Sequence, residues 1–155
     1  MRPDLVKAMH DLTFRMRLFK AGQEEQQVGK VCLTERETLI LELLAESGPM
    51  SVSKLSLADP DASDSTISST ITGLWRNKLV TKKISPENQR TTTIGLTETG
   101  RKIIEGFVEQ REDRLHAFCE AINTTDDEEE VMLNVFTRAI NFFDERLGIR
   151  TVASK

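Results

Sequence analysis

Apolar side chains recur every three or four residues near the start of the chain. Leucine, methionine and phenylalanine hold these positions over residues 4–20, and charged residues fill most of the others. This spacing gathers the apolar side chains on one face of a helix. Gly22 and the polar run 23–27 follow. The pattern therefore predicts an amphipathic helix over residues 4–20.

The next two helical segments begin at residues that favour a helix N-terminus. Thr34 precedes Glu37 by three residues, the spacing of a capping box, in which each side chain bonds the other residue's backbone amide. An apolar stripe follows, and Gly48-Pro49 ends it. Ser51 can then cap a short third helix.

A fourth helix is predicted after a turn around Pro60, because proline disfavours helix at the residue before it. Ser63 or Asp64 can cap this helix, which extends to about Asn77. Its apolar residues lie at helical spacing and predict a buried stripe: Ile67, Ile71 and Leu74.

Residues 79–84 and 91–96 have the composition of β-strands, and the polar, turn-rich segment 85–90 separates them. Such a pair indicates a β-hairpin. A long helix is expected after Thr97, and a last helix after Thr125 with its run of carboxylates. The fold class predicted is therefore mainly α with a small β-hairpin (α+β).

Length, cysteine content and hydropathy indicate how many domains the chain forms and which cellular setting suits it. A chain of 155 residues fits one domain that buries a core without disulfides or metals. Cys32 and Cys119 are its two cysteines, which suits a reducing, cytoplasmic setting. No apolar run approaches the ~20 residues of a membrane span.

The sequence carries no recognisable catalytic or cofactor motif, so we expect neither an enzyme nor a cofactor. The two histidines, His10 and His116, lack the spacing of metal ligands. The acidic run 126–130 is interpreted as a helix start rather than as a metal site.

The net charge of −4 argues against a nucleic-acid partner until it is resolved by segment. Residues 32–62 carry a net −4 and residues 103–155 a net −6, whereas residues 63–102 carry +4. The central stretch, which contains the fourth helix and the hairpin, is therefore a basic region between acidic neighbours.

Two short helices joined by a turn and followed by a hairpin indicate a winged helix-turn-helix, with the fourth helix as recognition helix. Opposite its apolar stripe, small polar residues and one arginine repeat at helical spacing: Ser65, Ser69, Thr72 and Arg76. This face is free of bulky side chains and could enter a major groove.

The hairpin and its flanks resemble a known family. The Asn-Gln-Arg tip at 88–90, the short strand after it, and Leu96-Thr97 before Gly100 are similar to the wing of the multiple-antibiotic-resistance regulator (MarR) family. Residues 33–37 and 48–55 also look like that family, so the resemblance covers about residues 33–100.

The resemblance implies a homodimeric transcriptional regulator, a repressor, that binds double-stranded DNA at a palindromic operator. It assigns residues 33–100 of the single domain 1–155 to the DNA-binding lobe, and residues 1–22 and 101–148 to a helical dimerisation region. Arg90 would enter a minor groove, and lysines would contact phosphates. The DNA-binding residues expected are Lys54, Ser63, Ser65, Thr66, Ser68, Ser69, Thr72, Arg76, Lys82, Lys83, Asn88, Gln89 and Arg90.

Four features depart from the family pattern. The turn at residues 59–62 is one residue longer, and Ser69 stands where the family has an arginine early in the recognition helix. The glycine that usually ends the recognition helix is Lys78, so Asn77 or Lys78 must take the exit conformation. The acidic residue of the wing tip is Asn88, so any side-chain bond that orients the tip arginine would be neutral and weaker.

The family also suggests a small aromatic or anionic effector where the dimer helices meet the lobe. The side chains proposed to bind it are Met9, Phe14, Arg15 and Trp75. For Trp75, packing in the core or hinge is the favoured interpretation, and most of the apolar side chains of residues 9–19 are likewise assigned to the core.

A second class of function stays open: a winged-helix protein-interaction module that does not bind DNA. The acidic net charge favours it, whereas the basic 63–102 segment and Arg90 oppose it. The dependence of duplex binding on salt would separate the two functions.

Overall fold

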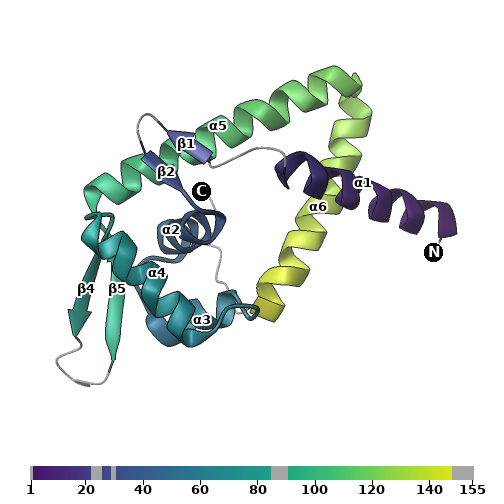
Figure 1. Cartoon of the computed structure of the whole chain (residues 1–155). Helices are drawn as coiled ribbons and strands as arrows, with labels where there is room; N and C mark the ends of the chain where they lie inside the picture. Colours follow the sequence, from purple (N-terminus) through teal and green to yellow (C-terminus); the bar gives the residue numbers. More distant parts are fainter. Residues whose placement is uncertain (1, 22–25, 29–30, 85–90, 148–155) are drawn as a thin grey trace.

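A computed structural model describes residues 2–21, 26–28, 31–84 and 91–147. Its helices and strands follow one another from an N-terminal helix, through a lobe of short elements, to two long helices (Figure 1). In chain order these are α1 (Pro3–Ala21), β1 (Gln26–Val28), β2 (Val31–Leu33), α2 (Glu35–Ser47), β3 (Met50–Ser51), α3 (Val52–Ala58), α4 (Asp64–Arg76), β4 (Val80–Ile84), β5 (Thr92–Leu96), α5 (Glu98–Ile122) and α6 (Asp126–Leu147). Every predicted helix and both predicted strands are present.

The small sheet of the lobe has three antiparallel strands in the order β3-β5-β4. β4 and β5 form the predicted hairpin, in which Val80 pairs with Leu96 and Lys82 pairs with Ile94. The two-residue strand β3 was not predicted, and neither was the separate β1–β2 ribbon. Segments this short show no alternation of apolar and polar residues, so the sequence pattern did not indicate them.

The hydrophobic core lies within the lobe. Among the described residues, all the buried apolar side chains lie between Leu33 and Phe107. They come from β2, α2, α3, α4, the β4–β5 hairpin with the residue before it, and the first half of α5. The stripe of α4 predicted to be buried is at the centre of this core, with Ile67, Ile71 and Leu74 no more than 1% exposed.

The predicted capping residues are confirmed at each helix start. Thr34 and Glu37 form a full capping box at α2, and Ser51, Ser63 and Thr97 cap α3, α4 and α5 through their hydroxyls. Of the two residues that could cap α4, Ser63 does so.

The last helix starts with a second capping box. The amide of Thr125 donates to the Glu128 carboxylate at 2.9 Å, and the Glu128 amide donates to the Thr125 hydroxyl at 3.4 Å. The Thr125 hydroxyl also donates to the Glu128 carboxylate, at 3.0 Å. The two bonds that this carboxylate accepts, from the amide and the hydroxyl of Thr125, hold the pKa of Glu128 below its usual value.

Helix α4 ends in a Schellman motif built on Lys78. The Lys78 amide donates to the Trp75 carbonyl at 3.0 Å, and the Leu79 amide donates to the Leu74 carbonyl at 2.9 Å. Lys78 has a φ of 61°, in the left-handed region, whereas Asn77 has a φ of −79°. Lys78 therefore takes the exit conformation that glycine would adopt with less strain.

Three backbone segments meet where the hairpin joins α5. The Thr97 amide donates to the Leu79 carbonyl at 3.0 Å, and the Thr97 hydroxyl lies 2.7 Å from the Lys78 carbonyl oxygen. Gly100, in the first turn of α5, packs directly against the Leu79 carbonyl, and a β-carbon there would overlap it. The end of α4, the base of β4 and the start of α5 are thus held together at Gly100.

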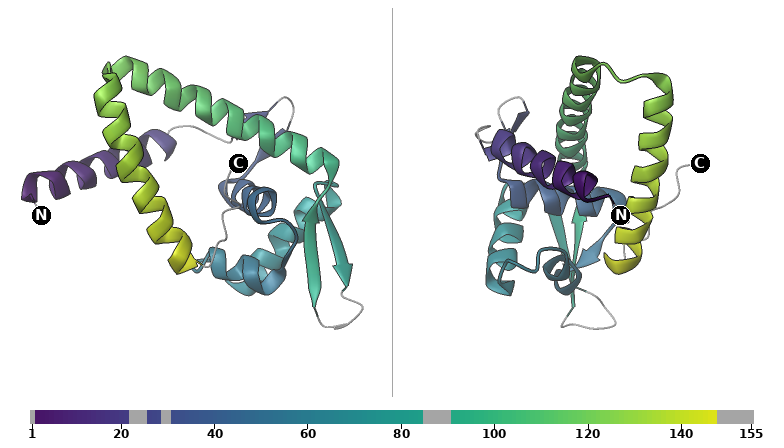
Figure 2. Two further views of the ribbon diagram at one scale, coloured as in Figure 1. Left: turned by 180° about the vertical axis from the view of Figure 1, so that it is seen from behind. Right: turned by 90° about the vertical axis from the view of Figure 1, so that its right-hand side faces the viewer.

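Helices α1 and α6 and the far end of α5 lie outside the lobe. α5 leads away from the hairpin, α6 turns back from its end, and α1 lies on the same side of the molecule as α6 (Figures 1 and 2). Many large apolar side chains on these helices are about half exposed or more: Leu5, Val6, Met9, Leu12, Phe14, Met16, Leu18, Phe19, Leu115, Phe118, Ile122, Val131, Leu133, Val135, Phe136, Ile140, Phe142 and Phe143.

The assignment of the α1 side chains to the core is therefore wrong for the single chain. Met9, Phe14, Met16, Leu18 and Phe19 are each at least 52% exposed, because α1 lies outside the lobe and does not contribute to its core. None of the helices in the described part of the chain is long and apolar enough to span a membrane.

Replacing Gly100 with alanine is expected to destabilise the protein by about 2 kcal/mol or more, because the new methyl group must displace the Leu79 backbone. Urea unfolding followed by circular dichroism measures the free energy of unfolding. Gly73→Ala is the matched control: its β-carbon would meet only the Glu37 carboxylate, at 3.9 Å, so it should be neutral or stabilising. Equal effects at the two positions would contradict the close approach at Gly100.

Replacing Lys78 with glycine should stabilise the protein by roughly 0.5–1 kcal/mol, because glycine adopts a positive φ without steric cost. Thermal unfolding checks this. Asn77→Gly is the control: its φ is already favourable, so added chain entropy in the unfolded state should destabilise it. A loss of stability in Lys78→Gly would show that Lys78 is not strained.

Candidate nucleic-acid interface

Helix α4 presents a polar face directly opposite its buried stripe. Ser65, Ser69 and Arg76 are exposed on this face, while Ile67 and Leu74 on the other side are fully buried. The helix is fixed in place by its core stripe and by the Schellman motif at its end. The small polar face predicted from the sequence is therefore present at the surface of the lobe.

Several hydroxyl groups on α4 already bond within the helix. The Ser63 hydroxyl lies 2.8 Å from the hydroxyls of Ser65 and Thr66 and accepts the Thr66 amide. The Thr72 hydroxyl donates to the Ser68 carbonyl at 2.8 Å. Ser68 and Ser69, by contrast, are exposed, and within the described ranges their side chains have no hydrogen bond.

The hairpin places its two lysines on opposite faces. Lys82 pairs with buried Ile94, and Lys83 pairs with Thr93 on the other side of the ribbon, because neighbouring strand residues alternate. Lys82 thus lies on the face toward α4, where its Nζ donates to the Thr72 hydroxyl at 3.0 Å. The expected wing-tip residues Asn88, Gln89 and Arg90 lie outside the described residues.

Lys54 completes the expected basic residues of the lobe. It is exposed in the first turn of α3, where its amide donates to the Ser51 hydroxyl at 3.3 Å. The structure therefore gathers Lys54, Lys82, Lys83 and Arg76 on the lobe that carries α4, in addition to the serines of the polar face.

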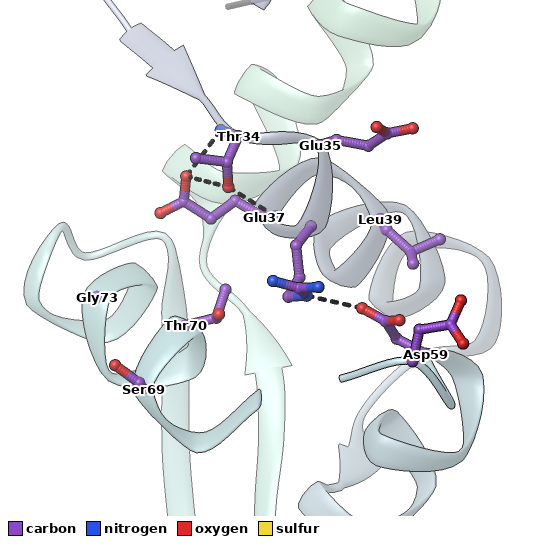
Figure 3. A pocket seen from close by; sticks show the side chains of 10 residues that line it. Thr34, Glu35, Glu37, Leu39, Asp59, Ser69, Thr70 and Gly73 are labelled. Atoms are coloured by element: carbon purple, nitrogen blue, oxygen red, sulfur yellow. Dashed lines mark hydrogen bonds and ion pairs between the residues drawn. The ribbon is translucent and has the colours of Figure 1, made fainter. Parts of the chain in front are cut away.

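On the side of α4 away from the hairpin, the surface is hollowed and acidic (Figure 3). The hollow has a volume of about 770 Å³ and separates the start of α2 from α4. Its lining residues are Thr34, Glu35, Arg36, Glu37, Leu39, Asp59, Asp61, Ser69, Thr70 and Gly73.

The charge of this hollow disfavours a phosphate within it. Four carboxylates line it against one guanidinium, and Arg36 Nε is paired with Asp59 at 2.7 Å. The surface beside α4 is thus acidic on the side of α2 and basic on the side of the hairpin. The net charge of residues 63–102 did not reveal this difference between the two sides. Nowhere in the described ranges do three or more His, Cys, Asp or Glu side chains gather to hold a metal.

The side chains proposed for an effector are not brought together within one chain. Met9, Phe14 and Arg15 lie on α1, whereas Trp75 lies on α4. Arg15 donates to the Asp11 carbonyl at 2.9 Å, along its own helix.

Of the two placements predicted for Trp75, core or hinge, the core placement is wrong. Its side chain is 50% exposed, and the Lys82 ammonium lies 5.4 Å from the centre of its ring. Trp75 follows the buried Leu74 by one residue, so it falls at the edge of the apolar stripe, where the helix surface meets the hairpin. Trp75 lies three residues after Thr72, a spacing that makes the two side chains neighbours on the helix surface. This spacing was the signal in the sequence that Trp75 borders the polar face of α4.

One ion pair joins the lobe to the long helix. Arg111 of α5 lies 2.6 Å from a carboxylate oxygen of Glu42 on α2, and this oxygen is buried. It anchors the middle of α5 beside the lobe, before the helix continues toward α6. Sequence patterns carry no signal for such a pair, because its members are far apart along the chain.

Comparisons with solved structures support the fold. A MarR family transcription regulator matches with a TM-score of 0.68 and 21% identity, covering 95% of each chain. BpsR of Bordetella bronchiseptica, whose DNA binding is regulated by 6-hydroxynicotinic acid, matches with a TM-score of 0.61 and 20% identity over 86% of this chain and 98% of its own. A mutant of MepR from S. aureus, bound to an oligodeoxyribonucleotide, matches with a TM-score of 0.57 and 21% identity over 86% and 97%.

The predicted resemblance to MarR regulators is thus confirmed. A search of curated protein sequences found no match. A profile of the family described as "Transcriptional regulator SarA/Rot" matches residues 24–107, just over half of the chain. This range contains the whole buried core, α4 and the β4–β5 hairpin. The protein is a winged-helix transcriptional regulator and belongs to the SarA/Rot family.

Proposed function

We propose that this protein binds double-stranded DNA sequence-specifically, as a homodimer on a palindromic operator, and acts in the cytoplasm as a repressor. The observation that carries the proposal is the exposed polar face of α4 next to a basic hairpin on the same lobe. A helix of this kind fits a major groove, and a hairpin beside it can reach the adjacent phosphates and minor groove. The similar fold of a MepR mutant that was solved bound to an oligodeoxyribonucleotide supports DNA as the partner.

The roles of the residues follow from their positions. Ser65, Ser68 and Ser69 would contact base edges or phosphates, and Arg76 would anchor the C-terminal end of α4. Lys54, Lys82 and Lys83 would contact phosphates, and Arg90 would enter a minor groove. Ser63 and Thr66 would act at the helix start, where their hydroxyls already bond the backbone and each other.

The dimer is supported by the apolar side chains outside the lobe. Soluble monomers rarely expose large contiguous apolar patches, yet α1, α6 and the far end of α5 carry many half-exposed leucines, methionines and phenylalanines. A second copy of the chain would cover them and place two lobes in a fixed relation, so their spacing would set the spacing of the operator half-sites. An effector bound between the lobe and the dimer helices would change this spacing. Such an effector is consistent with BpsR, whose DNA binding is regulated by 6-hydroxynicotinic acid.

Selection of duplexes from random-sequence and genomic pools by the purified protein should enrich a palindrome. Affinity for that duplex should fall steeply with salt, because bound phosphates release counterions. Arg76→Ala and Arg90→Ala should each weaken binding and lower the salt slope by about one. Lys102→Ala is the control: Lys102 pairs with Glu98 at 3.6 Å on α5 and should leave the slope unchanged. Failure to enrich any duplex, even at low salt, would favour the protein-interaction module instead.

Sedimentation equilibrium should give a mass twice that of one chain. Introducing a charge by Phe136→Glu or Ile140→Glu on α6, where both side chains are 54% exposed in the single chain, should produce monomers. Leu57→Glu on α3 is the matched control, because Leu57 is 78% exposed but belongs to the lobe. If the α6 variants remain dimeric, the apolar surface of α6 is not the dimer interface.

A further inference from the structure

The most unusual contact on the proposed DNA-binding surface joins the hairpin to α4. On β4, Val80, Lys82 and Ile84 share one face, and Val80 and the partner of Lys82, Ile94, are buried in the core. Lys82 is thus the position where this face leaves the core and passes the end of α4. Its ammonium group is directed to α4 by the register of the sheet.

Two side chains of α4 hold this ammonium group. Lys82 Nζ donates to Thr72 Oγ1 at 3.0 Å and lies 5.4 Å from the centre of the Trp75 ring. Tryptophan offers a cation the most favourable aromatic face. Thr72 in turn donates its hydroxyl proton to the Ser68 carbonyl at 2.8 Å, which fixes the direction of its lone pairs. Lys82 is therefore oriented although its side chain is exposed.

We propose that Thr72, Trp75 and Lys82 form a preorganised phosphate clamp, which we call the lysine clamp, at the edge of the DNA groove. The proposal rests on the DNA-binding function proposed above. An ammonium group has three N–H donors. Thr72 accepts one, and the other two can bond oxygens of one phosphate. Lys82 contacts the DNA, and Thr72 and Trp75 are positioning residues that act through it.

The benefit of the lysine clamp is conformational. A free lysine side chain loses rotamer entropy when it binds a phosphate, whereas one already held across α4 loses less. The clamp also ties the hairpin to the recognition helix, so both elements would meet the duplex in a fixed relation. In this proposal Thr72 positions Lys82 instead of contacting DNA directly. Trp75 belongs to the proposed DNA-binding surface instead of to the core or an effector site.

The charge distribution around α4 favours this position for a phosphate. The side of α4 that faces α2 borders the acidic hollow with Glu37, Asp59 and Asp61. The side that faces the hairpin carries Lys82 instead. A phosphate strand following α4 is therefore repelled on one side and attracted on the other.

A double-mutant cycle on the selected duplex tests the lysine clamp. Lys82→Ala should lower the salt slope by about one. Thr72→Val, which keeps the shape of the side chain but lacks the hydroxyl, should weaken binding about threefold, whereas Thr72→Ser should bind like the wild type. In the Lys82→Ala background, Thr72→Val should have no further effect. Trp75→Leu should follow the pattern of Thr72→Val.

Lys83→Ala is the matched control, because it removes the same charge from the opposite face of β4. Thr72→Val should weaken binding as much in the Lys83→Ala background as in the wild type. If the effects of Thr72 and Lys82 are additive, or if Thr72→Val binds like the wild type, the lysine clamp is wrong while DNA binding stands. If the wild-type protein selects no duplex, both the proposed function and the clamp fail.

The clamp can also be observed without DNA. Trp75 is the only tryptophan of the chain, so its fluorescence reports on this ring alone. Lys82→Met should change the emission of the free protein, whereas Lys83→Met should not. Equal spectra for wild type and Lys82→Met would show that the ammonium does not rest on the ring and would overturn the clamp.

Discussion

The contact of Gly100 with the Leu79 carbonyl is the constraint on which the lobe depends. It allows the first turn of α5 to lie against the backbone that links α4 to β4, and the Thr97 hydroxyl bonds the same backbone at the Lys78 and Leu79 carbonyls. Because α4 ends there and the hairpin begins there, this one junction sets their relative orientation. The face of β4 that carries Lys82 therefore lies against α4, where Lys82 bonds Thr72.

The distribution of charge is compatible with the proposed DNA-binding surface on an acidic protein. Acidic side chains line the hollow between α2 and α4 and the start of α6, whereas lysines and arginines lie on α4 and the hairpin. Repulsion from the acidic regions would weaken non-specific binding, and the basic edge of α4 would determine how the lobe sits on a duplex. The net charge alone contains no information about this arrangement.

In the described part of the chain, a lobe with its own core is followed by the far end of α5 and by α6, which, like α1, contribute no side chain to that core. Buried apolar side chains end at Phe107, and α1 and α6 expose theirs. The Glu42–Arg111 ion pair lies near this boundary and joins α2 of the lobe to α5. In the proposed dimer, a change in how the two copies pack their long helices would reach α4 through α5 and the junction at Gly100, which provides a physical route for regulation of the proposed DNA binding.

The sequence by itself determined the helices, the hairpin and their starting residues. Capping by Thr34, Ser51, Ser63 and Thr97 requires only hydrogen bonds between near neighbours, and helical periodicity depends on spacing alone, so both can be derived without the fold. The resemblance of residues 33–100 to MarR regulators led to the right fold for the same reason, because its motifs are local.

Only the tertiary structure decided which side chains meet across elements. It placed Lys78 rather than Asn77 in the left-handed conformation, Trp75 at the surface instead of in the core, and Lys82 on Thr72. It also revealed the β1–β2 ribbon, the acidic hollow beside α4 and the exposed apolar faces of α1 and α6. These features arise from the register of the sheet and from packing between distant segments, which periodicity along the chain cannot encode.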